Sequence, residues 1–294
     1  MTIYKQGQLQ MIKTVFAATV AALLTFTASA TAQFTYAPTS RDDVGLYLGG
    51  QFWQPDATGV LGAENTRVDF NLKKQQHIQY FIDVKHPVAA LPHLRISTTQ
   101  LDTSGQTTLT QQFGFSDKTF PVAATVNASF NVSYIDYTLY YALFDSDKFS
   151  FEVGFSARDL HGDVTVAGTT KISHDPCNDP NPAPNDPCID LGNNAISSGT
   201  IKTDNINPML FVATSVALPS TQLNVFAQAD FSLLNDHRLS DYQLGFSYDL
   251  HKLMRVDLQV TLGYRVVNMA FENLNSLYTD LAFKGAFVGL IAHF

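Results

Sequence analysis

The chain has 294 residues and a formal net charge of −8, from 18 Lys and Arg against 26 Asp and Glu. This acidic balance excludes the basic surface on which nucleic-acid binding depends, so we expect no nucleic-acid partner. Beyond residue 32 no run approaches the roughly 20 consecutive apolar residues of a transmembrane helix. Any membrane-spanning part must therefore be built from strands.

Residues 1–32 resemble an export signal. Lys13 gives a short basic start, and an apolar run from Val15 to Thr27 follows. Small residues at 28–30 and 30–32 offer cleavage sites. We expect cleavage after Ala32, which leaves residues 33–294 as one domain. The alternative is a retained anchor, but the apolar run is short for a bilayer span.

Ten later segments alternate apolar and polar residues with the two-residue period of a strand. They are 44–53, 77–86, 94–101, 126–143, 149–159, 209–218, 223–234, 242–250, 256–266 and 283–294. The apolar phase of 126–143 slips by one residue near Tyr134 and Ile135, which predicts a β-bulge. Long connections at 54–75, 102–124, 170–205 and 269–281 alternate with short ones at 87–91, 145–148, 219–221 and 251–254, with the brief 235–241 connection as the exception.

The last segment carries the clearest signal. An unbroken apolar face runs back from the terminal aromatic residue at every second position, through Phe294, Ala292, Leu290, Val288 and Ala286. We expect this strand to pair antiparallel with the first one and so close a barrel. The glycines Gly49 and Gly50 should lie in or near that seam, where glycine marks a bend or the close approach of another backbone.

Alternation has the same period whether the apolar face meets a soluble core or lipid. Three features favour lipid: the alternation of short and long connections, aromatic residues near strand ends, and export combined with a terminal phenylalanine. We predict an all-β, transmembrane antiparallel up-and-down barrel of ten strands, eight being the alternative, in a bacterial outer membrane with both termini periplasmic. The expected partners are outer-membrane lipids, the barrel-assembly machinery and periplasmic chaperones; no cofactor is expected, and the oligomeric state stays open. A soluble periplasmic β-sandwich or lipocalin-like barrel is the competing interpretation.

Three stretches carry a resemblance: D-V-G-L-Y-L-G-G-Q-F-W at 43–53, H-P-V-A-A-L-P-H at 86–93 and K-G-A-F-V-G-L-I-A-H-F at 284–294. Together they resemble a family of proteobacterial outer-membrane proteins marked by a Gly-Gly pair in the first strand. The resemblance covers nearly all of the exported chain. It implies a predicted barrel and its location, and it implies no activity.

If the apolar faces meet lipid, charged residues of both signs share the lumen and should pair with one another. The predicted lumen network comprises Asp83, Lys85, Arg95, Asp136, Glu152, Arg158, Asp230, Asp249, Asp257 and Arg265. Side chains nearly fill a barrel of about ten strands. We therefore predict a filled lumen and a structural or surface-binding role, with a narrow solute channel as the alternative.

A lipid-modifying or proteolytic enzyme is the other class to weigh, because such barrels need a His with Ser or Asp near the rim or wall. His161 with Asp159 and Asp163, and His237 with Asp236, supply those ingredients. No motif of a known barrel enzyme accompanies them. We predict no enzymatic activity.

Two cysteines, Cys177 and Cys188, bracket a proline-rich loop. Export to an oxidising compartment predicts a disulfide between them. A metal site among the loop's Asp residues at 175, 179, 186 and 190 is the alternative, although the spacing matches no calcium loop. This loop is also the best candidate for binding through the external surface. His86 and His93 bracket a short turn and are expected to be interfacial polar residues.

Overall fold

The computed structural model describes residues 44–63, 66–171, 194–219, 221–234, 237–250, 256–274 and 277–294. The predicted export signal and both cysteines lie outside these ranges. By its contacts the chain divides into a barrel unit and a second unit whose described part is residues 87–91, where Leu91 N donates to Val88 O at 3.1 Å. Among the described residues no helix is long and apolar enough to cross a membrane.

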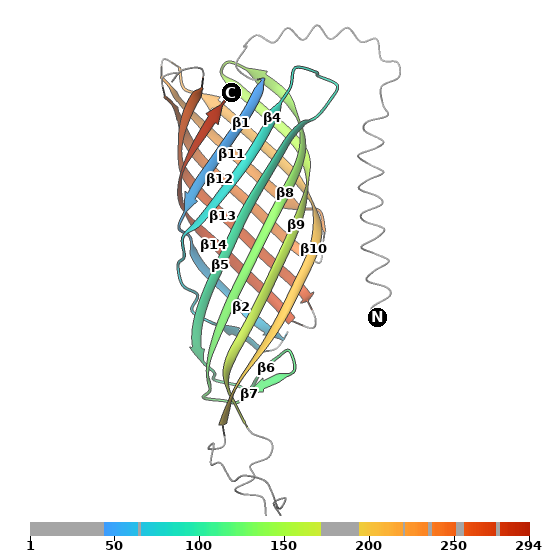
Figure 1. Ribbon diagram of the computed structural model, residues 1–294, viewed down its shortest axis with the longest axis vertical. Coiled ribbons are helices and arrows are strands. Elements are labelled where there is room, and N and C mark those ends of the chain that lie inside the picture. Colours follow the sequence, from blue (N-terminus) through green and yellow to red (C-terminus); the bar gives the residue numbers. More distant parts are fainter. Residues whose placement is uncertain are drawn as a thin grey trace, which may run out of the picture. The chain divides into compact units, whose positions relative to one another are not determined.

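The barrel unit consists of antiparallel strands joined into one closed sheet (Figure 1). Its strands are β1 (Gly45–Trp53), β2 (Asp56–Ala63), β3 (Thr66–Asp69), β4 (His77–Lys85), β5 (His93–Thr108), β8 (Thr125–Ser146), β9 (Phe149–Lys171), β10 (Asn194–Ala217), β11 (Leu223–Ser232), β12 (His237–Asp249), β13 (Asp257–Leu274) and β14 (Leu277–His293). β1 pairs with β14, Gly50 lying opposite Leu290, and this pairing closes the ring. The predicted ten-stranded antiparallel barrel is confirmed.

The wall has ten positions although the sheet has twelve strands, because two wall strands are each divided. β1 pairs with residues 287–293 of β14, and β2 continues along the same strand against residues 278–284. Pro55 lies at the break, where its missing N–H ends the ladder. The Trp53 indole N–H spans the gap by donating to Gly285 O at 3.0 Å. β3 and β4 form the second wall strand in the same divided way.

Both faces of β8 change polarity at the same level. The buried face is apolar from Val126 to Val132, whereas beyond Tyr134 it carries Asp136 and Thr138. The opposite face changes the other way, from Asn, Ser and Thr side chains at 125–133 to Ile, Tyr and Leu at 135–143. The ladder with β9 is continuous here, Ile135 lying opposite Asp159. The predicted bulge at this point is therefore wrong: the apolar phase slips because the surroundings of both faces reverse. An irregularity does occur in β8, between Ala142 and Phe144.

The same reversal occurs around the wall. On β9 the outer face is apolar from Phe149 to Ala157 and becomes polar at Asp159; on β10 it becomes apolar beyond Asp204. On one side of this level lies a belt of outward apolar side chains, including Phe155, Leu244, Leu262 and Leu290, which are about half or more exposed. Such a belt around a polar interior is the exterior of a membrane-spanning barrel. We call the reversal level the belt edge.

On the other side of the belt edge the interior of the barrel is apolar, like the core of a soluble protein. A continuous cluster of buried apolar side chains, with Phe70, Phe130, Leu160 and Phe283 among its members, fills the space. Figure 1 shows β8, β9 and β10 reaching furthest at this end. We call it the hairpin end, after the two short strands β6 (Phe113–Phe115) and β7 (Lys118–Phe120) that lie there.

The β6–β7 hairpin belongs to this core. Phe113, Phe115 and Phe120 are at most 1% exposed, and the hairpin packs against β2, β9 and β10. The Phe113 ring meets Phe70 edge-on at 5.9 Å between centroids. Residues 102–124, predicted to be a polar loop, thus contain the end of β5 and this hairpin. The predicted loop at 54–75 likewise holds β2 and β3, and the loops at 170–205 and 269–281 are shortened by extended strands.

Candidate functional site

Two buried arginines occupy the middle of the lumen. Arg158 on β9 binds Asp136 through two parallel hydrogen bonds, Nε to Oδ1 at 2.7 Å and Nη2 to Oδ2 at 2.9 Å. Arg265 on β13 binds Asp241 in the same fork geometry, at 2.9 Å from Nε and 2.6 Å from Nη2. Arg158 Nη2 also reaches Asp241 Oδ2 at 3.2 Å. These contacts form a continuous Asp136–Arg158–Asp241–Arg265 chain that joins four strands, and bidentate pairs of this kind are the strong ones.

Neutral side chains extend this ion-pair chain to further strands of the barrel wall. The Tyr134 hydroxyl donates to Asp241 at 2.8 Å, and Arg265 donates to Gln79 Oε1 at 2.5 Å and to Thr99 Oγ1 at 3.3 Å. The Arg158 guanidinium lies 3.9 Å from the Tyr134 ring centroid. Side chains from β4, β5, β8, β9, β12 and β13 therefore meet in one network, which crosses the lumen just inside the belt edge.

Four predicted lumen charges form a second group nearer the other end of the barrel. Lys85 Nζ lies 2.7 Å from Glu152 Oε1, and Arg95 lies 3.6 Å from Asp83, which also accepts from Tyr140 at 2.8 Å. Both pairs line a cavity of about 610 Å³ bordered by the short β8–β9 turn. We call this cavity the vestibule.

The vestibule has a polar lining. Gln51, Gln243 and Thr261 line it, and each has a buried side-chain oxygen with no hydrogen-bond partner among the described residues. Such a space suits water or another small polar molecule. The arginine network lies beyond it, and the apolar core follows.

The three remaining predicted lumen residues have other surroundings. Asp230 accepts from Ser156 at 3.1 Å beside the arginine network. Asp249 is exposed and accepts from Gln259 at 2.6 Å, whereas Asp257 lies 4.0 Å from His293. The last two are therefore not part of the arginine network.

Asp241, which links the two arginines, is absent from the predicted lumen network, because the sequence predicts a connection at 235–241. The alternation of the predicted strand at 242–250 continues backwards through Asp241 to Leu239, and that continuity is the signal that could have identified it. Tyr134 is also absent from that network, because the sequence predicts a bulge at this residue. Its neighbours in the buried row, Val132 and Asp136, show that it faces the lumen.

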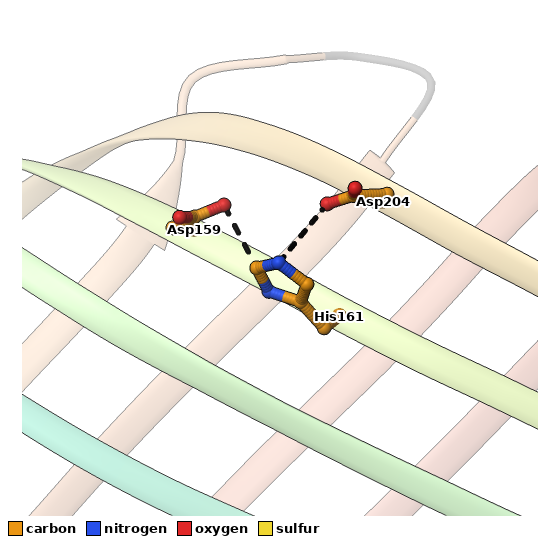
Figure 2. A group of neighbouring side chains, drawn as sticks. All are labelled: Asp159, His161 and Asp204. Carbon is orange, nitrogen blue, oxygen red and sulfur yellow. Dashed lines mark ion pairs between the residues drawn. The ribbon is translucent and has the colours of Figure 1, made fainter.

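A separate cluster, which we call the wall cluster, lies on the outer wall at the polar side of the belt edge. Asp159 and His161 project from β9, and Asp204 projects from the position opposite His161 on β10. His161 Nε2 is 3.3 Å from Asp204 Oδ1, and Nδ1 is 3.9 Å from Asp159 Oδ1. Figure 2 shows the Asp159 and Asp204 carboxylates on the same side of the imidazole ring, each joined to it by an ion pair. Of the residues predicted around His161, Asp159 joins the cluster; Asp163 instead accepts from Asn131 at 3.1 Å.

Other predicted features are placed as follows. His86 and His93 lie together, with ring centroids 5.0 Å apart and His86 Nε2 3.0 Å from Pro92 O. Gly49 and Gly50 lie in the seam opposite Ile291 and Leu290. Cys177, Cys188, Asp236 and the side chain of His237 lie outside the described residues, so the disulfide and the second histidine pair stay predictions.

No protein-family model matches the chain, and no curated protein matches it. The predicted membership of the Gly-Gly family is therefore not established. Among solved structures, the outer membrane protease OmpT from Escherichia coli aligns at 9% identity over 86% of this chain and 97% of its own, with a TM-score of 0.48. Ail, the attachment invasion locus protein of Yersinia pestis, aligns at 8% identity over 84% and 99%, TM-score 0.30, and neisserial surface protein A at 10% over 85% and 97%, TM-score 0.29.

Proposed function

We propose that this protein is an integral outer-membrane barrel that does not conduct solutes, is not an enzyme, and acts as a structural or surface-binding element. The apolar belt supports insertion among outer-membrane lipids. The part beyond the belt edge has a polar outer wall over a packed apolar interior, as in a soluble protein. That part would stand clear of the bilayer as a rigid base for the connections it carries, where binding function concentrates on such scaffolds.

The observation that carries this proposal is the filled lumen. A solute entering the vestibule meets the buried Asp136–Arg158–Asp241–Arg265 chain and then an apolar core that contains Phe70 and Phe130. Moving these groups aside would break charge-assisted hydrogen bonds and open a packed core at the same time. The vestibule is the one feature that favours the alternative of a narrow channel, and among the described residues it occupies only one end of the barrel.

Planar-bilayer recording tests the proposal. Purified protein should give no large, steady conductance, whereas a sixteen-stranded porin inserted in the same bilayers provides the open reference. Folding of the recorded protein is checked on a gel, because a folded barrel migrates differently before and after boiling. Large, stable current steps from heat-shifting protein would overturn the closed-lumen assignment and favour the channel.

We propose that the hairpin end faces outward and that both chain termini face the periplasm. Phe294 lies at the opposite end, beside β1, where Phe294 N donates to Leu46 O at 3.0 Å. Barrels of this class place both ends on the periplasmic side and depend there on periplasmic chaperones and the barrel-assembly machinery, which we propose as partners. An epitope tag inserted between residues 178 and 187 should stain on intact cells. Staining only after permeabilisation would contradict the orientation.

The proposal that the protein is not an enzyme rests on the surroundings of the wall cluster. Both ion-pair partners of His161 are carboxylates, Asp159 and Asp204. No serine, threonine or cysteine is hydrogen-bonded to His161 among the described residues, so the nucleophile–base arrangement of acyl transfer is not assembled there. Loss of any phospholipase, acyltransferase or protease activity in a His161→Ala variant would contradict this part of the proposal.

A further inference from the structure

The wall cluster of Asp159, His161 and Asp204 has a donor arrangement that the proposed structural role does not use. One nitrogen of His161 and one oxygen from each carboxylate lie within 4.8 Å of one another. The residues sit on two neighbouring strands in continuous register, with Asp204 opposite His161 and Ile206 opposite Asp159. Groups held on paired strands keep their spacing better than groups on loops.

The charge of the cluster is unbalanced. Among the described residues no lysine or arginine forms an ion pair with Asp159 or Asp204; each carboxylate is paired only with the one imidazole. Two carboxylates that share one site repel each other, and a divalent cation between them would remove that repulsion. The cluster is also accessible, because the His161 and Asp204 side chains are 56% and 76% exposed.

The donor types select the class of cation. Calcium and magnesium are bound through oxygen ligands, so they make no use of an imidazole. One imidazole nitrogen with carboxylate oxygens suits zinc and its first-row neighbours. We propose that Asp159, His161 and Asp204 form a divalent transition-metal site on the outer wall of the barrel, with further coordination positions open to solvent oxygen.

The site's position gives the metal a structural consequence. Asp159 is the first polar residue of the outer face of β9 beyond the apolar row that ends at Ala157. A bound ion would tie β9 to β10 at the belt edge, where the barrel wall leaves the apolar layer. The proposal does not depend on whether the lumen conducts.

Calorimetric titration with ZnCl₂ tests the proposal on untagged full-chain protein extracted in detergent. Both cysteines are replaced by serine in every sample, so that thiols do not contribute binding. We expect one saturable site, with His161→Ala and Asp204→Asn each weakening binding at least about tenfold. Asp163→Asn is the matched control: Asp163 lies on the same face of β9 outside the cluster, and its replacement should leave the affinity unchanged.

Paramagnetic resonance with Cu²⁺ supplies an independent readout, since copper occupies nitrogen and oxygen sites at least as tightly as zinc. Nitrogen coupling from one imidazole should appear in the parent protein and disappear in His161→Ala. Heat-shift gels verify that every variant is folded. Equal zinc affinity in the parent and His161→Ala proteins, or a copper signal unaffected by that substitution, would overturn the site.

Discussion

Replacing Arg265 by methionine should be among the most damaging single changes in the barrel. Arg265 is 2% exposed, and its guanidinium forms hydrogen bonds to Asp241, Gln79, Thr99 and Tyr134. Methionine keeps an unbranched, flexible side chain that is shorter and has no charge and no donors. The variant therefore leaves the Asp241 carboxylate and the Gln79 oxygen in a buried region without their main partner.

The expected cost follows from what Asp241 keeps. Removing one member of a buried ion pair costs about 3–5 kcal/mol. Asp241 retains a contact of 3.2 Å to Arg158 and a hydrogen bond of 2.8 Å from Tyr134. We therefore expect a loss near the lower end, about 3 kcal/mol of unfolding free energy. The double variant Arg265→Met with Asp241→Leu removes the orphaned charge as well, and should be more stable than the single variant by at least about 1 kcal/mol.

Urea unfolding in detergent, followed by tryptophan fluorescence, measures these differences. The chain has one tryptophan, Trp53, which is 1% exposed and lies 5.1 Å from the Arg265 guanidinium, so its emission reports on the network. Unfolding free energies come from linear extrapolation of the transition. A single variant within about 0.5 kcal/mol of the parent, or a double variant no more stable than the single, would refute the assignment of this ion pair as a buried cross-link.

Two further matched comparisons test the packing of Phe81 on Gly49 and the apolar belt. Gly49→Ala should lower the unfolding free energy by about 1–3 kcal/mol, because the ring of Phe81, opposite Gly49 on β4, occupies the space of the new methyl group. Gly50→Ala, with its nearest contact at 3.5 Å, should change it little, and equal losses in urea titrations would argue against this packing of Phe81 on Gly49. Leu262→Lys, at the middle of the outward apolar row of β13, should lower the unfolding free energy in lipid bilayers by about 2–4 kcal/mol. The control Thr200→Lys, on the polar wall of β10, should lower it by less than about 0.5 kcal/mol. Similar losses at both positions would contradict the position of the belt edge.

The wall strands were predictable because their signal is local. A strand's two faces alternate residue by residue, so segments such as 149–159 and 223–234 are legible without knowing their neighbours. The closing strand was equally clear, and its pairing with the first strand follows from the need to leave no edge in lipid. Strand ends were less predictable: β5 and β10 continue well into regions whose outer faces are polar.

The β6–β7 hairpin was not predicted from the sequence, and of the wall cluster only Asp159 and His161 were. The reason differs from that for the strand ends. Phe113, Phe115 and Phe120 lie in a glycine- and threonine-containing stretch whose strands are three residues long, too short for a periodic pattern. Asp204 fell within a predicted loop, so nothing in the sequence placed it beside His161. Only the register of β9 against β10 brings these two residues together.

The sequence by itself determined which segments of this protein form strands with two unlike faces, since the period of each strand can be read without long-range information. Only the tertiary structure decided which face of each strand points into the lumen and which points outward at each position along the barrel axis. The slip near Tyr134 and Ile135 predicted a bulge, and it proved to be the belt edge, where the interior changes from polar to apolar as the exterior changes from apolar to polar. The physical reason is that the face on which an apolar residue is favourable depends on whether the wall is surrounded by lipid or by water at that position along the barrel axis. That position is set by the register of the neighbouring strands.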